Sequence, residues 1–182
     1  MVIAENSHQN LISAATIHHI WARHIVDSAQ LLSLHPRDGD RSWLDLGTGA
    51  GFPGMVAAIL NDAEVTLVEE RRLRHEFLSR CVGFLGLNSV TVHGGRLETL
   101  ATAKFATISA RAFAPLPKLL SLAHRFSRNE TVWLLPKGKK AVDELESALA
   151  AWHGMFHVKQ SLTDAEAAII VATGVQPKAK SG

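Results

Sequence analysis

Apolar and polar residues alternate along this chain with two different periods. Short apolar runs, typical of strands buried on both faces, lie at 42–46, 65–68, 89–92, 107–109 and 131–135. Between them, segments with apolar residues three and four positions apart predict helices at 53–61, 71–85, 116–126 and 141–152, and a short helix is expected after Arg96. A strand followed by a helix, repeated in this way, predicts an α/β fold with a doubly wound, mostly parallel sheet.

The two ends of the chain depart from this alternation. Residues 16–34 carry apolar side chains at helical spacing, which predicts an N-terminal helix that ends within 35–39. Residues 156–160 and 168–173 are predicted strands without a helix-length segment between them, so a closing hairpin should add one antiparallel strand. We therefore expect a single domain over 1–182, with an N-terminal helical segment at 1–38, an α/β core at 39–175 and a flexible polar tail at 176–182.

Composition narrows the class of protein. The chain has 182 residues, a formal net charge of +2 and a hydrophobic fraction of 47%, as in ordinary globular domains. This charge gives no global basic field, so any nucleic-acid surface must be a local patch. The single cysteine, Cys81, excludes a disulfide framework and indicates a reducing compartment. No apolar run approaches about 20 residues and the N-terminus lacks a signal-peptide pattern, so we expect a cytoplasmic protein without membrane contact.

The densest glycine cluster follows the first predicted strand. Gly47, Gly49 and Gly51 come directly after Asp45, and the next helix is expected to begin at Pro53. Glycines at this spacing let the backbone approach a nucleotide-like ligand, beside the free N–H groups of a helix start. In an open α/β sheet, this is the edge at which ligands bind.

Three interpretations of this turn compete. Residues 49–54 match the dinucleotide pattern G-x-G-x-x-G, and Glu69 follows about twenty residues later, where an acid accepts hydrogen bonds from ribose hydroxyls. This match predicts a nicotinamide-dependent oxidoreductase. In the second interpretation the glycines only make a tight turn between strand and helix. The third is a site for the methyl donor S-adenosylmethionine that includes Gly47 and Gly49.

Three features favour the methyl donor. Asp45 stands at the strand end, where a carboxylate repels a pyrophosphate but suits the cationic sulfonium and amino groups of S-adenosylmethionine. Phe52 and Pro53 leave little room for a diphosphate at the helix start. The chain has no tyrosine, which excludes a Tyr/Lys pair for hydride transfer.

Five segments occur in an order that extends this interpretation. They are Asn10-Leu-Ile-Ser13, Arg23-His-Ile-Val-Asp-Ser28, Asp45-Leu-Gly-Thr-Gly-Ala-Gly-Phe-Pro-Gly54, Ser109-Ala-Arg-Ala-Phe-Ala114 and Pro136-Lys-Gly-Lys139. Together they resemble the bacterial 16S ribosomal RNA guanine-N7 methyltransferase family, also called glucose-inhibited division protein B. The resemblance runs from about Asn10 to about Thr173.

The resemblance implies a class I, Rossmann-like methyltransferase fold with S-adenosylmethionine as cofactor. It implies a guanine N7 in 16S ribosomal RNA as acceptor, guanine 527 in the family's conventional name. By position it implies cofactor binding by Gly47, Phe52, Glu69, Leu97, Glu98 and Arg111. Guanine N7 carries a free lone pair, so we expect catalysis by placement of the reactants and no general base.

RNA contacts are expected from Arg23, His24, Arg111 and Lys137. The first predicted helix either presents Arg23 and His24 to RNA or carries them in a solvated stripe with local ion pairs. Arg111 follows the fourth strand, where it can pair with a phosphate or, alternatively, with Glu98. Lys137 follows the fifth strand at the same edge, and phosphate contacts of this kind weaken with salt.

Several further side chains either have two possible roles or are assigned no role in the site. Phe113 either stacks on an exposed base or packs beneath its loop. The arginines of the second predicted helix are expected to form a solvated face: Arg71, Arg72, Arg74 and Arg80. The 10 histidines are scattered, and no His, Asp or Glu group has metal-ligand spacing, so no metal is expected.

Two departures from the family pattern keep one alternative open. Ala106 stands before the fourth strand, where the family commonly has Asp, and the helical region before Asn10 is shorter than usual. A non-catalytic relative that binds the donor and RNA during ribosome assembly remains the alternative. We expect the enzyme, acting on the small ribosomal subunit as a monomer.

Overall fold

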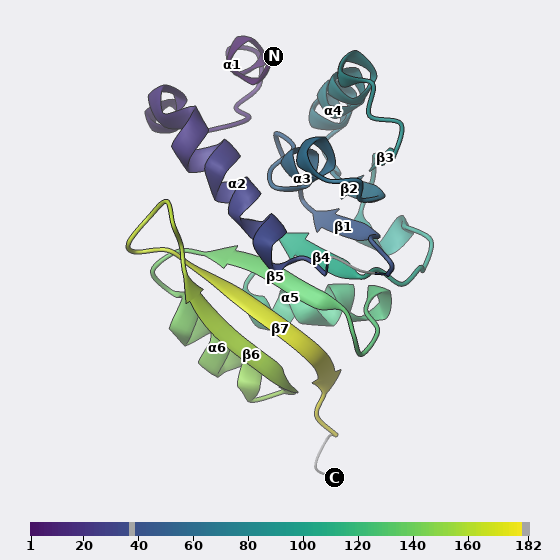
Figure 1. The fold of residues 1–182 in the computed structure, drawn as a ribbon, viewed down its shortest axis with the longest axis vertical. Helices are drawn as coiled ribbons and strands as arrows, with labels where there is room; N and C mark the ends of the chain where they lie inside the picture. Colours follow the sequence, from purple (N-terminus) through teal and green to yellow (C-terminus); the bar gives the residue numbers. More distant parts are fainter. Residues whose placement is uncertain (37–38, 180–182) are drawn as a thin grey trace.

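Figure 1 shows the fold of the protein in a computed structural model, which describes residues 1–36 and 39–179. Over these residues a 7-stranded sheet has the order β3-β2-β1-β4-β5-β7-β6. The strands are β1 (Trp43–Leu46), β2 (Val65–Val68), β3 (Val90–His93), β4 (Thr107–Ala110), β5 (Val132–Lys137), β6 (Trp152–Gln160) and β7 (Ala168–Pro177). β7 pairs antiparallel with β5 and β6, whereas the other pairs are parallel. The expected mostly parallel, doubly wound sheet with one antiparallel strand is confirmed.

Helices cover both faces of this sheet. α3 (Gly54–Leu60) and α4 (Arg72–Leu85) pack on one face, and α5 (Leu116–Ala123) and α6 (Ala141–Leu149) lie on the other, behind the strands in Figure 1. Short turns of 3-10 helix, η4 (Leu97–Thr99) and η5 (His124–Phe126), complete the connections. Successive strand side chains point to opposite faces, so Leu44 and Leu46 join the core on the α5 side and Trp43 the core on the other.

The N-terminal segment packs on the α3–α4 side. It consists of α1 (Val2–Glu5), η1 (Ala14–His19), η2 (Trp21–Val26), α2 (Asp27–Ala29) and η3 (Gln30–Leu34). The helix expected at 16–34 is thus present, but it starts at Ala14 and changes between 3-10, π and α hydrogen bonding. The sequence did not predict α1. Residues 37–38, at the expected boundary between segment and core, lie outside the described residues.

The C-terminal hairpin is longer than expected. α6 ends at Leu149 and β6 already begins at Trp152, whereas we expected the helix to reach 152 and the strand to start at 156. β7 continues to Pro177, and the Lys178 amide donates to the carbonyl of Ala151 at 2.8 Å. The expectation of a flexible tail from 176 is therefore wrong for 176–178, because strand pairing orders this polar stretch; 180–182 lie outside the described residues.

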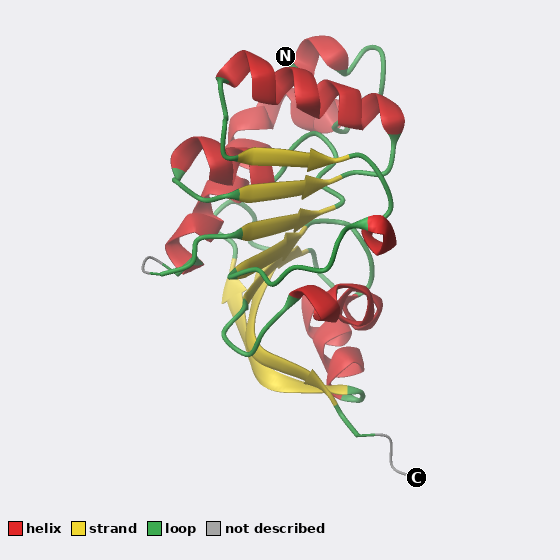
Figure 2. Ribbon diagram, turned by 90° about the vertical axis from the view of Figure 1, so that its right-hand side faces the viewer, coloured by secondary structure: helices red, strands yellow, loops and turns green. Residues whose placement is uncertain are grey.

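Figure 2 shows that the parallel strands point the same way, so their carboxyl ends meet at one edge of the sheet. The glycine turn after β1 and the loops after β2, β4 and β5 all lie at this edge. Within the described part of the chain, no helix is long and apolar enough to cross a membrane.

Candidate functional site

The turn between β1 and α3 depends on its glycines. Gly47, Gly49 and Gly51 have φ of 61°, 60° and 97°, the left-handed region that other residues adopt at a cost. A Cβ at Gly47 would lie 2.6 Å from the ring of Phe113, and one at Gly54 would lie 2.7 Å from the Cβ of Asp45. The turn therefore needs glycine both for its backbone angles and for its close contacts.

Asp45 stabilises this turn from inside the protein. Its carboxylate is fully buried; Oδ1 accepts from the Ser109 hydroxyl at 2.5 Å and Oδ2 from the Gly54 amide at 2.9 Å. Burial raises the pKa of Asp45, and these hydrogen bonds oppose the rise. The expectation that Asp45 faces a cationic ligand is wrong, because both oxygens are used between β1, β4 and the start of α3.

Glu69 stabilises the glycine turn from the end of the neighbouring strand. It lies just beyond β2 with 4% of its surface exposed. Its Oε2 accepts from the Gly49 amide at 3.0 Å and its Oε1 from the Arg71 amide at 2.9 Å. Gly49 thus acts through its backbone N–H, which ties the glycine turn to the end of β2.

Two cavities open at the carboxyl edge of the sheet. The first, which we call the turn cavity, has a volume of about 410 Å³, and its lining includes Gly47, Glu69, Leu97, Glu98 and Lys118. The second, the arginine cavity, has a volume of about 760 Å³, and its lining includes Arg23, His24, Asp27, Arg111, Lys137 and Glu144. The segment from Ala112 to Ala114 lines both and forms their common wall. Ala112 has a φ of 54°, so this wall contains a non-glycine residue in the left-handed region.

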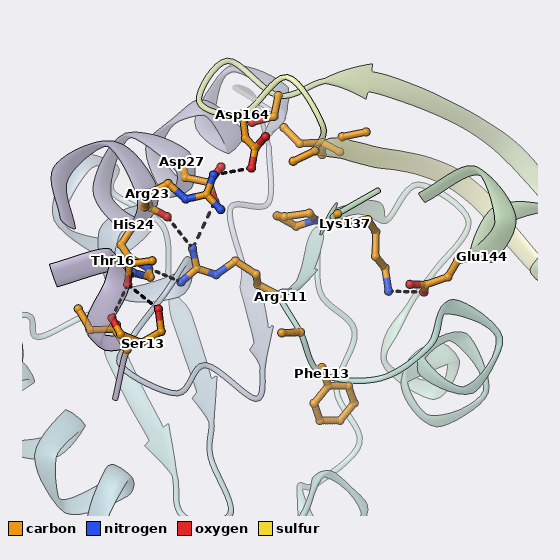
Figure 3. A pocket seen from close by; sticks show the side chains of 18 of the residues that line it. Ser13, Thr16, Arg23, His24, Asp27, Arg111, Phe113, Lys137, Glu144 and Asp164 are labelled. Atoms are coloured by element: carbon orange, nitrogen blue, oxygen red, sulfur yellow. Dashed lines mark hydrogen bonds and ion pairs between the residues drawn. The ribbon is translucent and has the colours of Figure 1, made fainter. Parts of the chain in front are cut away.

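Arg111 is held at the rim of the arginine cavity by the N-terminal segment (Figure 3). Its Nη1 lies 3.2 Å from Oδ2 of Asp27, and its Nη2 donates to Nδ1 of His24 at 3.0 Å. The guanidinium also lies over the ring of Phe52, 5.5 Å from its centroid. The alternative ion pair with Glu98 is wrong, because the carboxylate that Arg111 contacts is Asp27.

His24 is the neutral partner in this cluster. Since Arg111 donates to Nδ1, the ring proton sits on Nε2, which lies 2.9 Å from the hydroxyl of Thr16. The ring stacks on Phe52 with centroids 5.1 Å apart. Burial, together with the charge of Arg111, lowers the pKa of His24 to about 4.

The chain is similar to known ribosomal RNA methyltransferases over almost its whole length. The family described as rRNA small subunit methyltransferase G (GidB) matches residues 1–169. The protein belongs to this family. The Sphingopyxis alaskensis ribosomal RNA small subunit methyltransferase G is 56% identical over 179 residues, covering 98% of this chain and 77% of that protein. The Rhizorhabdus wittichii protein of the same name is 54% identical over 182 residues, covering 99% of this chain and 84% of its own.

Solved structures support the fold at much lower identity. The glycopeptide N-methyltransferase MtfA, complexed with S-adenosylmethionine, has a TM-score of 0.69 at 9% identity, covering 82% of this chain and 93% of that chain. The ribosomal protein L11 methylase of Lactobacillus delbrueckii subsp. bulgaricus has a TM-score of 0.64 at 14% identity, covering 84% and 77%. These likenesses confirm the class I, Rossmann-like methyltransferase fold.

Membership of the rRNA small subunit methyltransferase G family decides which cofactor and substrate the protein uses. The protein is an S-adenosylmethionine-dependent methyltransferase of small-subunit ribosomal RNA. The nicotinamide interpretation is therefore wrong for this protein. That the glycine turn binds the methyl donor stays a prediction.

The structure distributes the expected site residues between the two cavities. Gly47, Glu69, Leu97 and Glu98 line the turn cavity. Arg23, His24, Arg111 and Lys137 line the arginine cavity. Gly49 and Phe52 lie beneath these linings, Gly49 hydrogen-bonded to Glu69 and Phe52 buried under His24 and Arg111.

Lys137 and Phe113 are more enclosed than an RNA-contacting role suggests. Only 8% of the Lys137 side chain is exposed; its Nζ donates to Glu144 at 2.7 Å and to the Ala114 carbonyl at 3.1 Å. Lys137 therefore does not present a free cation at the rim. The Phe113 ring packs against the hydrophobic core and over Gly47, which favours packing rather than base stacking.

Sequence reasoning missed part of the site. Arg71, Arg72 and Arg80 are exposed, as expected of a solvated face, but Arg71 also lines the turn cavity. Arg74 is half-buried at this cavity and donates to the carbonyl of Asn10 at 2.8 Å, so the expectation is wrong for Arg74. Asp27 was not expected to hold Arg111. The alternative for Arg23 was a local ion pair along the first helix, but Arg23 pairs with Asp164, 2.5 Å away across the cavity.

The low pKa of His24 makes a prediction about pH. Arg111 and Arg23 lower this pKa and Asp27 raises it, with burial the largest effect. The folded ring stays neutral until the pH falls to about 4, whereas the unfolded chain takes up the proton near its ordinary value of 6.5. The free energy of unfolding should therefore fall as the pH drops from 6.5 towards 4.

The titration of the His24 ring by NMR measures this directly. We expect a midpoint of about 4 in the wild type and a higher midpoint in Arg111→Ala, because that change removes a nearby positive charge. A wild-type midpoint near 6.5 would contradict the hydrogen bond from Arg111 to Nδ1.

Proposed function

We propose that the protein transfers a methyl group from S-adenosylmethionine to N7 of a guanine in 16S ribosomal RNA, guanine 527 by its family resemblance. The observation that carries this proposal is the common wall of the two cavities, from Ala112 to Ala114. A donor in one cavity and a base in the other would lie on either side of this segment, so direct transfer requires the two cavities to open into each other beside it.

The residues of the turn cavity fit the donor. Gly47, in the left-handed region, lines the cavity with its backbone, and a Cβ there would meet the Phe113 ring, which lines the same cavity. We assign donor binding to Gly47, Leu97 and Glu98, and to Glu69 and Gly49 as the hydrogen-bonded pair that fixes the turn beside the donor. We assign Phe52 and Arg111 to the arginine cavity side of the common wall, where Phe52 supports Arg111 and His24.

When bound, S-adenosylmethionine supplies a methyl group on a cationic sulfur, which is ready for displacement. The residues of the chain have to bind, orient and enclose the reactants. Asp45 and Glu69 fix the glycine turn, and Asp27 and His24 fix Arg111. Since N7 of guanine needs no proton removed, none of these side chains is required as a base.

RNA contact is proposed for exposed cations near the two cavities. Arg23 is 44% exposed at the arginine cavity, Lys118 is exposed at the turn cavity, and Lys139 is 73% exposed after β5. We propose that His24 and Arg111 contact RNA from deeper in the arginine cavity. Lys137 would act indirectly, because its Nζ donates to the Ala114 carbonyl in the common wall. Contacts of this kind bind phosphate without sequence choice and weaken with salt.

We further propose that the chain works as a single methyltransferase domain and as a monomer, since one chain supplies both cavities. We also propose that the enzyme is cytoplasmic, because its proposed substrate is a small ribosomal subunit or its RNA.

Ala106 does not argue for a non-catalytic relative. It precedes β4, with its amide donating to Ser42 at 3.0 Å. It therefore lies at the amino end of the strand, opposite the edge that carries the two cavities. Its lack of a carboxylate leaves the proposed chemistry intact.

Transfer of labelled methyl from S-adenosylmethionine to small ribosomal subunits tests the proposed function. We expect incorporation into 16S RNA and recovery of the label as 7-methylguanosine. Naked 16S RNA is the parallel substrate, and large-subunit RNA is the control. Donor binding without any incorporation would support the non-catalytic alternative instead.

A further inference from the structure

We propose that Glu144 recognises the acceptor base as guanine, by accepting hydrogen bonds from its N1–H and N2–H groups. This inference rests on the proposed function, because it concerns the base that the arginine cavity receives. It assigns a specificity role to a side chain on α6, on the side of the cavity away from the Arg111 cluster (Figure 3).

The carboxylates that line the arginine cavity are not equivalent. Asp27 accepts from Arg111 on Oδ2 and from Thr163 and Gln30 on Oδ1. Asp164 accepts from Arg23 on Oδ2 and from the Glu166 amide on Oδ1. Both acids are therefore occupied at each oxygen by groups of the protein.

Glu144 has one oxygen left for a ligand. Its Oε2 accepts from the Leu116 amide at 2.8 Å and from Nζ of Lys137 at 2.7 Å. Among the described residues, Oε1 has no hydrogen-bond donor. The side chain is 28% exposed and lines the cavity, so Oε1 is within reach of a base but the carboxylate is fixed by two donors on its other oxygen.

The position of Glu144 suits a base that must present N7 to the donor. Lys137 joins Glu144 to the Ala114 carbonyl, and Ala114 belongs to the common wall of the two cavities. Guanine carries N7 and O6 on one edge and its N1–H and N2–H donors on the Watson–Crick side. Contact with Glu144 through the Watson–Crick side leaves N7 without a hydrogen bond and open to methylation.

The same contact discriminates between bases. One carboxylate oxygen has two lone pairs, enough to accept from both N1–H and N2–H. Adenine has an acceptor at N1, which would face a negatively charged oxygen without a proton between them. Recognition of the Watson–Crick edge in this way is common for bases that are read outside a duplex.

The test compares guanine with inosine, which keeps N1–H and N7 but lacks the N2 amino group. Labelled methyl transfer is measured on RNA carrying either base at the target position. We expect wild-type kcat/KM to fall about 10- to 100-fold with inosine, the loss of one hydrogen bond to a charged acceptor. For Glu144→Gln we expect a comparable loss of kcat/KM with guanine. The kcat/KM of this variant with inosine should then lie only slightly below its value with guanine.

Glu146→Gln is the matched control, since Glu146 is exposed on the same helix and lines neither cavity. It should keep the wild-type rates and the wild-type preference for guanine. Donor affinity, measured by calorimetry, should be unchanged in both variants.

Two outcomes would overturn the role of Glu144. The first is equal wild-type rates with guanine and inosine, a result that needs no variant to fold. The second is a Glu144→Gln loss that is the same for both bases, which would mean that Glu144 only holds Lys137. Absence of any transfer by the wild type to guanine RNA is a different result, and would overturn the proposed function itself.

Discussion

Gly47→Val weakens the binding of S-adenosylmethionine by at least about 30-fold and leaves the sheet folded. This is the first of the two largest effects that we expect. The change places a side chain in the left-handed region, where φ is 61°, at a cost of about 1–2 kcal/mol. Its Cβ would also lie 2.6 Å from the Phe113 ring, and overpacking of this kind costs about 1–3 kcal/mol.

The way in which the protein relieves the contact between the new Cβ and the Phe113 ring determines whether donor binding is affected. Phe113 packs against the core on one side and lines the turn cavity on the other. A displaced ring therefore moves into the space that the donor requires. Costs of about 2 kcal/mol or more correspond to a loss of affinity of at least about 30-fold.

Calorimetric titration with S-adenosylmethionine measures this loss, with circular dichroism as the check on folding. Gly83→Ala is the control, because Gly83 lies within α4 and a Cβ there would have nothing within 4 Å. That variant should bind the donor normally and gain up to about 1 kcal/mol of stability from helix propensity. Normal donor binding by folded Gly47→Val would relocate the donor site.

Arg111→Ala should reduce methyl transfer to small-subunit RNA by at least about 100-fold. The guanidinium joins the N-terminal segment to the common wall through Asp27 and His24. Its removal leaves a mostly buried carboxylate without its cation, since the two side chains are only 23% and 17% exposed. Loss of such a partner costs about 1–3 kcal/mol of stability, and the wall loses its support at the same time.

The prediction also distinguishes an effect on the RNA acceptor from an effect on donor binding. Arg111 lines the arginine cavity, so we expect the loss in kcat/KM for RNA, with the donor affinity changed much less. Arg111→Lys should recover only part of the activity, because one ammonium group cannot reproduce the planar contacts to Asp27 and His24. Arg72→Ala removes an arginine side chain that is 78% exposed, and it should have no effect. An equal loss of donor affinity in Arg111→Ala would instead place Arg111 in the donor site.

The fold was largely predictable because its signals are local. The buried strands β1, β2 and β4 appear as short apolar runs, and α4 as a helical pattern that ends at Gly86, which adopts the left-handed conformation. The errors lie where tertiary contacts override local preference. The polar residues 176–177 are ordered because β6 pairs with them, a partner more than twenty positions away in sequence.

The site was predictable as a set of positions but not as a set of contacts. The family segments place Arg23, Arg111 and Lys137 near one edge, and the structure confirms that they line one cavity. Their ion-pair partners were not predictable from the sequence. Arg23 pairs with Asp164 at a sequence separation of 141, and Arg111 pairs with Asp27 at a separation of 84. A charge pattern read along the chain favours neighbours three or four residues away, and it misses such pairs.

By itself, the sequence determined the sheet, the glycine turn and the methyltransferase family, because hydrophobic period, backbone freedom and motif order are properties of neighbouring residues. Only the tertiary structure decided that Asp45 is buried, that His24 is neutral beneath Arg111, and that Glu144 keeps one oxygen for a ligand. These features depend on which side chains meet after folding. Desolvation and hydrogen bonding at these contacts then determine the protonation state of each group and whether an oxygen remains free to accept from a ligand.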